Sequence, residues 1–494
     1  MREGPMRNLR ALMSLAALLA GCTVGPDYHP PDTPMPARFS GTGSATTADI
    51  GQWWHSFGDP ELDHLIEQAM RDNPDVQTAA SRVREARLQE IVAGAPLWPS
   101  LRADDQAAHT HLSGNAISLG NLGTLTGGAI PSGGSSSLSS LGLSGTSFNT
   151  YQLGFDASWE LDLFGKTRRS VEASRDSTGA AIWDRRDTQV SLAAEVANTW
   201  FALHAAQARL DVAKGELARQ QALLAVVRTR QSTGFVTGLD VAQQNTQVTA
   251  SAAALPPFQA EIDARRHALA VLVGEAPETL DLPATGVRSA TPPGIPPGLP
   301  SDLLRRRPDI RSAERQLAAA TANIGVAVAD YYPQITLTAS PSLISTALSN
   351  LLSWGSRNLS LSAGLIWPLF NAGTTKAKVG IANEHQQQAL FAYRKTVLTA
   401  LKDVEDALSQ YQSDKDRQSA LQRSLAAAGN AADVARGQYR AGLIPFSTVL
   451  TTEAALYSAR DQSAQADAAL NQDLVALYKA LGGGWSEETT EAAR

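Results

Sequence analysis

The sequence predicts an α+β membrane protein in which a strand hairpin joins a long antiparallel helical cylinder, and in which each chain contains this arrangement twice. Three observations predict this fold class: segments that match at constant offsets, short segments of alternating polarity, and helical segments much longer than those of ordinary domains. The 494 residues would also suffice for two or three ordinary domains, so length alone does not decide.

Two constant offsets reveal the internal repeat. Residues 73–76 (NPDV) match residues 307–310 (RPDI), 234 positions later, and Trp98-Pro99 matches Tyr332-Pro333 at the same offset. Further along, the offset becomes 208. This offset pairs Trp159 with Trp367, Gly165 with Gly373, Gly234 with Gly442, and Gly274 with Gly482. The change falls within the Ser/Gly-rich residues 113–149, for which we expect a flexible loop.

Polarity alternates in the segments that we expect to be strands. The apolar residues of the two clearest segments are Tyr151, Leu153, Phe155, Ala157 and Trp159 in the first repeat, and Leu359, Leu361, Ala363, Leu365 and Trp367 in the second. Weaker strands are expected at 100–112 and 334–342. Each segment has about 9 to 11 residues, the length of a tilted strand that crosses a bilayer. We therefore expect Tyr151, Leu153, Phe155, Trp159, Leu359, Leu361, Leu365 and Trp367 to face lipid.

The remaining segments predict long helices. Residues 166–232 carry apolar side chains every seven positions from Val196 to Leu224, and residues 239–273 and 449–477 carry similar stripes. Pro256-Pro257 must kink the second of these helices. At 1.5 Å per residue, 166–232 spans about 100 Å, and 239–273 and 62–95 span about 52 and 51 Å, so two short helices end to end match one long one.

Four strands per chain cannot close a barrel, for which about 8 is the practical minimum. Closure therefore requires several chains. Trp98, Tyr332, Trp159 and Trp367 all fall where a strand meets a helix, so we expect them at one membrane interface. A soluble barrel core would need a second layer against the apolar strand faces, and the sequence does not supply one.

Composition excludes several classes. The formal net charge is −6, which argues against nucleic acid as a partner. A single cysteine excludes disulfides within the chain and CxxC-type sites. No run of 18 apolar residues follows the N-terminus, so no helical membrane span is expected.

The N-terminus predicts export. Residues 6–10 are basic, residues 11–20 are apolar, and Leu19-Ala20-Gly21-Cys22 resembles the bacterial lipobox. We expect cleavage before Cys22 and lipid attachment to its thiol.

A set of short motifs is spread over nearly the whole chain after residue 21. They are 22–28 (CTVGPDY), Trp53-Trp54 with Phe57, Asp59-Pro60, 162–165 (DLFG), 255–257 (LPP), 304–310 (LRRRPDI), Tyr332-Pro333, 367–370 (WPLF) and 480–485 (ALGGGW). Together they resemble the TolC-like outer membrane factors, particularly the lipoprotein branch that serves RND-type efflux pumps.

This resemblance implies a homotrimer that is lipid-anchored in the outer membrane and extends into the periplasm. Its twelve-stranded β-barrel would continue into a long periplasmic α-helical barrel. The implied function is a passive gated exit duct for small molecules, which docks on a periplasmic adaptor (membrane fusion) protein and an inner-membrane RND-type transporter. A TolC-like channel for protein secretion and an exported coiled-coil scaffold are the alternatives, although a scaffold would not explain the paired strands.

The expected organisation follows from these boundaries. It comprises a signal peptide at 1–21, an N-terminal anchor and periplasmic segment at 22–61, a first repeat at 62–274, a Pro-rich linker at 275–301, a second repeat at 302–482 and a tail at 483–494.

The apparent chemical motifs do not predict an enzyme. Gly165-Lys166-Thr167 lacks the preceding glycine of a phosphate-binding loop, because Glu160 stands there. His109 and His111 share a strand face, but two histidines beside a loop are more often solvated than metal-bound. We expect no catalytic residues, metal or cofactor.

A periplasmic gate is expected near the turns at Gly234 and Gly442. Asp433 has Ala225 as its counterpart in the first repeat, so three chains would form one ring of three carboxylates that favours cations. Arg436 and Arg440 would pair with neighbouring helices, and Tyr439 would add a hydrogen bond. The region resembles the aspartate-bearing constriction of TolC-like channels.

Overall fold

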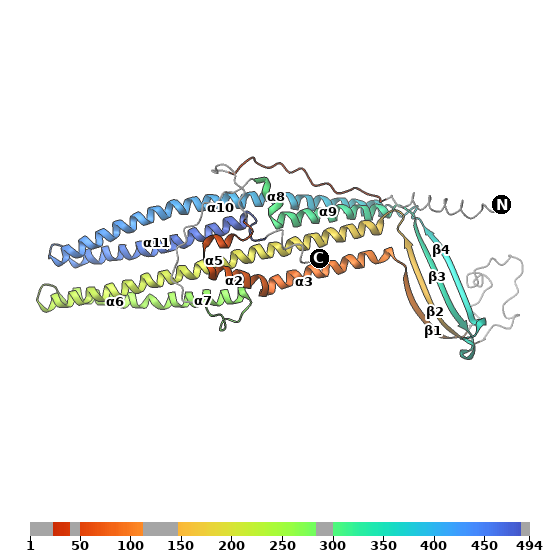
Figure 1. The fold of residues 1–494 in the computed structure, drawn as a ribbon, viewed down its shortest axis with the longest axis horizontal. Helices are drawn as coiled ribbons and strands as arrows, with labels where there is room; N and C mark the ends of the chain where they lie inside the picture. The colour runs from red at the N-terminus through yellow and green to blue at the C-terminus, as the bar shows by residue number, and fades with distance from the viewer. Residues whose placement is uncertain (1–22, 40–49, 112–146, 283–299, 486–494) are drawn as a thin grey trace. The chain divides into compact units, whose positions relative to one another are not determined.

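The computed structural model describes residues 23–39, 50–111, 147–282 and 300–485 (Figure 1). Cys22, the proposed lipid acceptor, and most of the expected loop and linker lie outside these ranges. Two compact units emerge, and each combines segments from both repeats. The described parts of Met1–Tyr28, Leu88–Arg175 and Ala319–Gln386 form the strand unit, and those of His29–Arg87, Asp176–Ala318 and Gln387–Arg494 form the helical unit.

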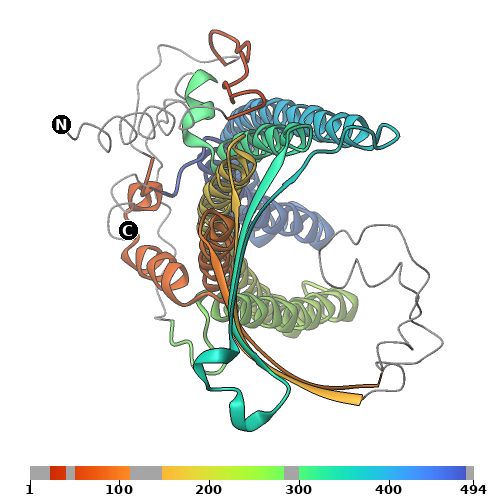
Figure 2. The same cartoon turned by 90° about the vertical axis from the view of Figure 1, so that its right-hand side faces the viewer.

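The strand unit contains one curved antiparallel sheet of four strands in chain order (Figure 2). The strands are β1 (Ser100–His111), β2 (Ser147–Leu161), β3 (Gln334–Ser345) and β4 (Arg357–Ile366). β2 starts at Ser147, before Tyr151, and β3 ends at Ser345, three residues beyond the predicted end, so both are longer than the alternation predicted.

The register gives the sheet one apolar and one polar face. Leu101 lies opposite Ala157, Ala157 opposite Ala339, and Ala339 opposite Leu361, so these residues share a face. On the other face, the hydroxyls of Thr338 and Ser362 are 2.6 Å apart. The alternation read from the sequence therefore extends across all four strands, with Asp105, His109 and His111 of β1 as polar exceptions on the apolar face.

The first long helix agrees with the predicted bounds of 166–232. α5 (Lys166–Ser232) and its counterpart in the second repeat, α10 (Thr374–Arg440), have 67 residues each. The other helices are α2 (Pro60–Asp72), α3 (Pro74–Gly94), α6 (Gly238–Ala253), α7 (Leu255–Val273), α8 (Leu303–Arg306), α9 (Pro308–Ala329) and α11 (Phe446–Ala480). Short 3₁₀ turns occur at Trp53–Phe57, Ala95–Leu97, Pro300–Asp302, Leu348–Asn350 and Trp354–Ser356. Among the described residues, none of the helices has the length and apolar character needed to cross a membrane.

The expectation of one helix over 62–95 was wrong, because the segment is divided at Asn73. Proline disfavours the helical conformation in the residue before it, and Asn73, which precedes Pro74, has an extended backbone. Its side-chain oxygen accepts from the backbone N–H of Asp75 at 2.8 Å, which caps the start of α3.

A kink was predicted at Pro256-Pro257, and the helix is interrupted just before them, since α6 ends at Ala253 and α7 begins at Leu255. The second repeat carries Ala464 and Gln465 at the corresponding positions, and α11 is continuous there over 35 residues. The two repeats therefore differ in this helix because only one of them contains proline.

The repeat is also visible in individual hydrogen bonds. Two bonds of the first repeat recur between equivalent residues of the second. Trp159 Nε1 donates to Leu97 O at 3.1 Å, and its counterpart Trp367 Nε1 donates to Tyr331 O at 3.0 Å. Asn73 Nδ2 donates to Leu272 O at 2.9 Å, and its counterpart Arg307 Nη1 donates to Ala480 O at 3.0 Å. Both repeats thus use one contact to fix the strand–helix junction and another to join their short helices.

The core of the helical unit is built from the apolar stripes and an aromatic cluster. Trp200 and Leu203 of α5 are fully buried in it. The ring of Trp53 stacks on Tyr478 of α11 at 5.2 Å between centroids, and Phe57 packs on Phe201 at 5.0 Å. The Trp53-Trp54 and Phe57 motif is therefore a packing element.

Candidate functional site

The two helical hairpins of the helical unit end in turns at the predicted glycines. Gly234 and Gly442 have φ of +78° and +76°, a conformation that glycine adopts without steric cost. In each turn the next N–H bonds back to the helix, Phe235 to Arg230 O and Leu443 to Gln438 O, both at 2.9 Å. The turns are confirmed, and their location at the periplasmic tip stays a prediction.

Arg230, which the sequence analysis missed, joins these two turns. Its Nη1 donates to the backbone oxygen of Tyr439, and its guanidinium lies 4.7 Å from the centre of the Tyr439 ring. The Tyr439 ring is buried against Phe446. The Tyr439 hydroxyl has no hydrogen-bond partner among the described residues, so the expected hydrogen bond is made by its main chain instead.

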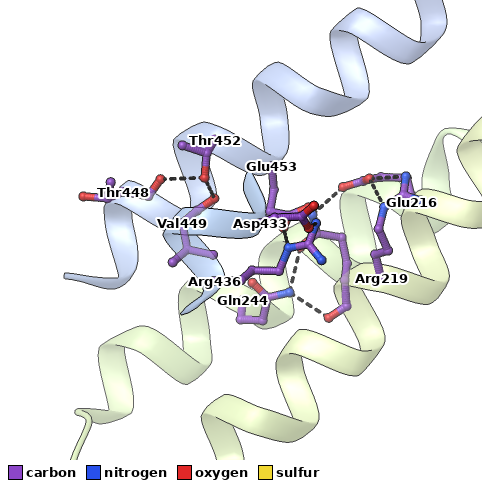
Figure 3. A network of polar contacts seen from close by, with 10 residues as sticks. Glu216, Arg219, Gln244, Asp433, Arg436, Thr448, Val449, Thr452 and Glu453 are labelled. Carbon is purple, nitrogen blue, oxygen red and sulfur yellow. Dashed lines mark hydrogen bonds and ion pairs between the residues drawn. The ribbon is translucent and has the colours of Figure 1, made fainter. Parts of the chain in front are cut away.

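Asp433 and Arg436 form an ion pair within α10 (Figure 3), whereas the sequence predicted that Arg436 would pair with a neighbouring helix. Arg436 Nη2 lies 3.1 Å from Asp433 Oδ1, and its Nε lies 2.7 Å from Glu453 Oε1 of α11, although this N–H does not point at the oxygen. The Asp433 side chain is 72% exposed, whereas that of Glu453 is 4% exposed. Arg440 contributes its backbone oxygen, which accepts from Arg230 at 3.5 Å.

Glu453, to which no sequence pattern pointed, is a buried carboxylate beside this ion pair. Burial raises its pKa, and the positive charge of Arg436 opposes that rise. A buried carboxylate needs such a partner, because leaving a charge unpaired in a low-dielectric environment is costly.

A second polar layer lies beside Glu453, on α5 and α6 (Figure 3). Gln244 donates to the side-chain and backbone oxygens of Gln220, both at 2.7 Å, and Arg219 lies 2.8 Å from the buried Glu216. Gln220 lies three positions after Leu217, and Gln244 lies three positions after Val241, both of which belong to the apolar stripes. In a coiled coil, the residue at this spacing is normally the second apolar residue of the heptad. Polar side chains at these heptad core positions were therefore the available sequence signal.

The predicted lipid-facing residues lie on the apolar face of the sheet. Leu153, Phe155, Trp159, Leu359, Leu361, Leu365 and Trp367 are exposed in the single chain, and Tyr151 is half-buried. At the strand–helix junctions, Phe164 stacks on Tyr332 with centroids 4.6 Å apart.

The two strand histidines each contact a residue of β2. His109 Nδ1 is 2.7 Å from Asn149 Oδ1, and His111 Nδ1 is 2.8 Å from Ser147 Oγ. Within the described ranges there is no group of three or more metal-ligating side chains.

Known proteins resemble this chain in sequence and in structure. The sequence pattern of the family described as "Outer membrane efflux protein" matches residues 65–275 and 299–483. The chain is 34% identical over 493 residues to the pyoverdine export outer membrane protein OpmQ of Pseudomonas aeruginosa, covering 99% of both chains. It is 30% identical to the probable outer membrane lipoprotein SilC of Salmonella typhimurium, covering 96% of this chain and 98% of SilC. The structure is similar to the outer-membrane channel OprN, with a TM-score of 0.81, 33% identity, and coverage of 94% of this chain and 100% of OprN.

Proposed function

Because this chain belongs to the outer membrane efflux protein family and forms the outer-membrane duct of an efflux system, we propose that it works as a homotrimer. The single observation that carries the proposal is the four-stranded sheet with one apolar and one polar face. Four strands are too few to close a barrel, and twelve from three chains suffice. The apolar face then meets lipid, and the polar face lines a passive water-filled channel.

The edges of the sheet supply the contact between copies. β1 and β4 each pair with one strand in the described chain, so each keeps a row of free backbone groups. In the proposed trimer, β4 of one copy pairs with β1 of the next. The trimeric helices then form the periplasmic α-helical barrel.

Two measurements test this arrangement. Native mass spectrometry of the protein extracted in detergent should give three chains per particle, and reconstitution into planar bilayers should give single-channel conductance. A stable monomer without conductance would contradict the proposal.

Cys22 is proposed as the lipid anchor in the outer membrane. The lipobox supports this role, and the relative SilC is named an outer membrane lipoprotein. Several acyl chains together hold a protein firmly at a membrane, whereas one chain anchors it only marginally. Mass spectrometry of the mature N-terminus should find an acylated Cys22, and an unmodified Cys22 would exclude the anchor.

The turns at Gly234 and Gly442 are proposed as the periplasmic gate, with Asp433, Arg436, Tyr439 and Arg440 beside the opening. The exposure of Asp433 supports this role, because three copies would present a ring of like charges. Conductance and cation preference should both change in Asp433→Ala. Unchanged values for both would place Asp433 away from the constriction.

The proposed partners are a periplasmic adaptor (membrane fusion) protein and an inner-membrane RND-type transporter, and no nucleic acid is expected. Crosslinking in intact cells through the turn at Gly442, followed by identification of the captured chain, tests the adaptor contact. Capture of a secretion component in its place would favour protein secretion.

A further inference from the structure

The first described residues of the chain lie against the junction between β2 and α5. Residues 23–27 contact Phe164, Gly165 and Arg169 at this junction and Gly325 of α9. We call Phe164, Gly165, Arg169 and Gly325 the N-terminal seat. All of these residues belong to the strand unit. Two motifs that the proposed function leaves unexplained, CTVGPDY and DLFG, therefore contact each other.

Glycines at three positions allow the backbones to approach closely. A Cβ on Gly325 would come within 2.9 Å of Val24 O, and one on Gly165 within 2.8 Å of the Thr23 side chain. A Cβ on Gly25 would come within 2.4 Å of Gly325 Cα. Gly25 and Gly165 also have φ of +92° and +80°, which disfavours any other residue.

Arg169 holds the seated segment by its main chain. Its Nε donates to Val24 O at 3.1 Å and its Nη2 to Gly25 O at 3.4 Å, while Val24 N–H donates to Phe164 O at 3.2 Å. Nη2 also bonds Asp27 Oδ1 at 2.7 Å. The Arg169 side chain is only 4% exposed, so its charge-assisted bonds to the main chain of Val24 and Gly25 are shielded from water.

Among the described residues, the repeat-related junction between β4 and α10 has no such seat. Gly373 is the counterpart of Gly165, and a Cβ added there would meet nothing within 4 Å in the described chain. The counterparts of Arg169 and Gly325 are Ala377 and Ile91. The strand–helix junction by itself does not need these residues, because the second junction forms without them. The contacts of Phe164, Gly165, Arg169 and Gly325 therefore serve the N-terminal segment.

We propose that the N-terminal seat is a dedicated binding site for the first residues of the exported chain, and that it positions the lipid acceptor beside the β2–α5 junction. Thr23 is bonded directly to the lipid acceptor in the chain, so holding Thr23 restricts the point from which the lipid-bearing residue extends. This inference deepens the proposed lipid anchor and rests on it for its consequence in the cell. The seat then sets where the acyl chains leave the protein, so that the lipid and the strands enter the membrane at a fixed spacing.

Hydrogen exchange measured by mass spectrometry on the full mature protein in detergent tests the seat. Gly325→Val inserts a side chain where Val24 lies, and Arg169→Ala removes the guanidinium. Both should speed exchange in residues 23–28 by about tenfold or more, because seating protects the amides only while it persists. Gly380→Val and Arg175→Ala are matched controls, because Gly380 has open space around it and Arg175 is an exposed residue of α5. Both controls should exchange as the wild type does.

Equal exchange in the wild type and in both seat variants would overturn the proposal. If either seat variant fails to assemble, Asp27→Ala decides, because it removes the acceptor of Arg169 Nη2 and the Asp27 side chain is 76% exposed, so its loss leaves the packing intact. Faster exchange of residues 23–28 in Asp27→Ala supports the seat, and unchanged exchange rejects it.

A lipid-free version separates the seat from the anchor. Cys22→Ser, exported with a signal that is removed without lipid attachment, should keep the protection of residues 23–28. Loss of that protection would show that the lipid, and not the seat, holds the segment. An unmodified Cys22 in the wild type, with residues 23–28 still protected, would contradict the anchor and leave the seat supported.

Discussion

Single residues in the interior of the helical unit carry charge that burial makes costly. Glu453 is almost fully enclosed and faces Arg436, whereas Asp433 contacts the same arginine from the solvent side. An exposed ion pair contributes about 0 to 1 kcal/mol, and leaving a buried polar group unsatisfied costs about 1 to 3 kcal/mol. Arg436 therefore matters for stability mainly through Glu453.

Replacement of Arg436 by alanine should lower the stability of the α10–α11 hairpin by about 1 to 3 kcal/mol. Glu453→Gln in the same background should restore part of this loss, because it removes the buried charge. Asp433→Ala is the matched control and should change stability by less than about 1 kcal/mol. Thermal denaturation followed by circular dichroism checks all three. Equal losses in Arg436→Ala and Asp433→Ala would contradict the assignment.

Asp473 of α11 should make stability depend on pH. Burial, a hydrogen bond with Asp414 and the charge of Asp414 raise the pKa of Asp473 to about 7. The unfolded carboxyl titrates near 3.8. Between about pH 4 and pH 7 the folded chain holds a proton that the unfolded chain has released, so stability falls as pH rises through this window.

Asp473→Asn keeps an uncharged side chain and should flatten this dependence, so that the variant is more stable than the wild type above about pH 7. Asp467→Asn is the control, because Asp467 also joins α11 to α10, through Gln418 at 2.6 Å. Melting temperatures measured from about pH 5 to pH 8 decide. A wild-type curve that stays flat over this range would refute the coupling of the two carboxyls.

At the scale of elements, the helix ends show how one backbone conformation serves two purposes. Gly234 and Gly274 have φ of +78° and +82°. A Cβ on Gly234 would meet nothing within 4 Å in the described chain, whereas one on Gly274 would lie 2.6 Å from Asp72 O. The first glycine only permits a turn, and the second also permits α7 to approach the end of α2.

Gly234→Ala should therefore cost about 1 to 2 kcal/mol, the cost of the left-handed conformation alone. Gly274→Ala should cost clearly more, because the new methyl group also pushes against the backbone of α2. Melting temperatures of the two single variants provide the comparison. Similar losses for both would show that the close approach at Gly274 relaxes freely.

At the scale of the whole molecule, the two faces of the sheet assign opposite environments to neighbouring residues. Leu361 lies on the apolar face and Ser360 on the polar face of β4. In the proposed barrel the first contacts lipid and the second contacts water. The same substitution at these adjacent positions should therefore have different effects.

Leu361→Arg should cost about 2 to 4 kcal/mol if the residue lies near the bilayer midplane, and should reduce assembly. Ser360→Arg should assemble normally, because its charge enters the water-filled interior. The fraction of trimer in native mass spectrometry of membrane extracts measures both. A freely tolerated Leu361→Arg would reject the orientation of the sheet.

Local patterns were sufficient for much of this fold. The 67-residue helix over Lys166–Ser232, the glycine turns and the alternating strands follow from periodicity and from residues with restricted or permissive backbones. The repeat was also evident, since residues at equal offsets make equal contacts. The sequence by itself thus determined the elements and their twofold repetition, because each depends on neighbours within a few turns.

Only the tertiary structure decided which polar groups are buried and what they bind. Asp433 attracted attention because it breaks the repeat, yet the enclosed carboxylate is Glu453, which meets Arg436 from another helix. Likewise, CTVGPDY and DLFG are distant in sequence and meet only when the chain is folded. Burial and long-range pairing depend on the packing of several elements at once, and no local period in the sequence records that packing.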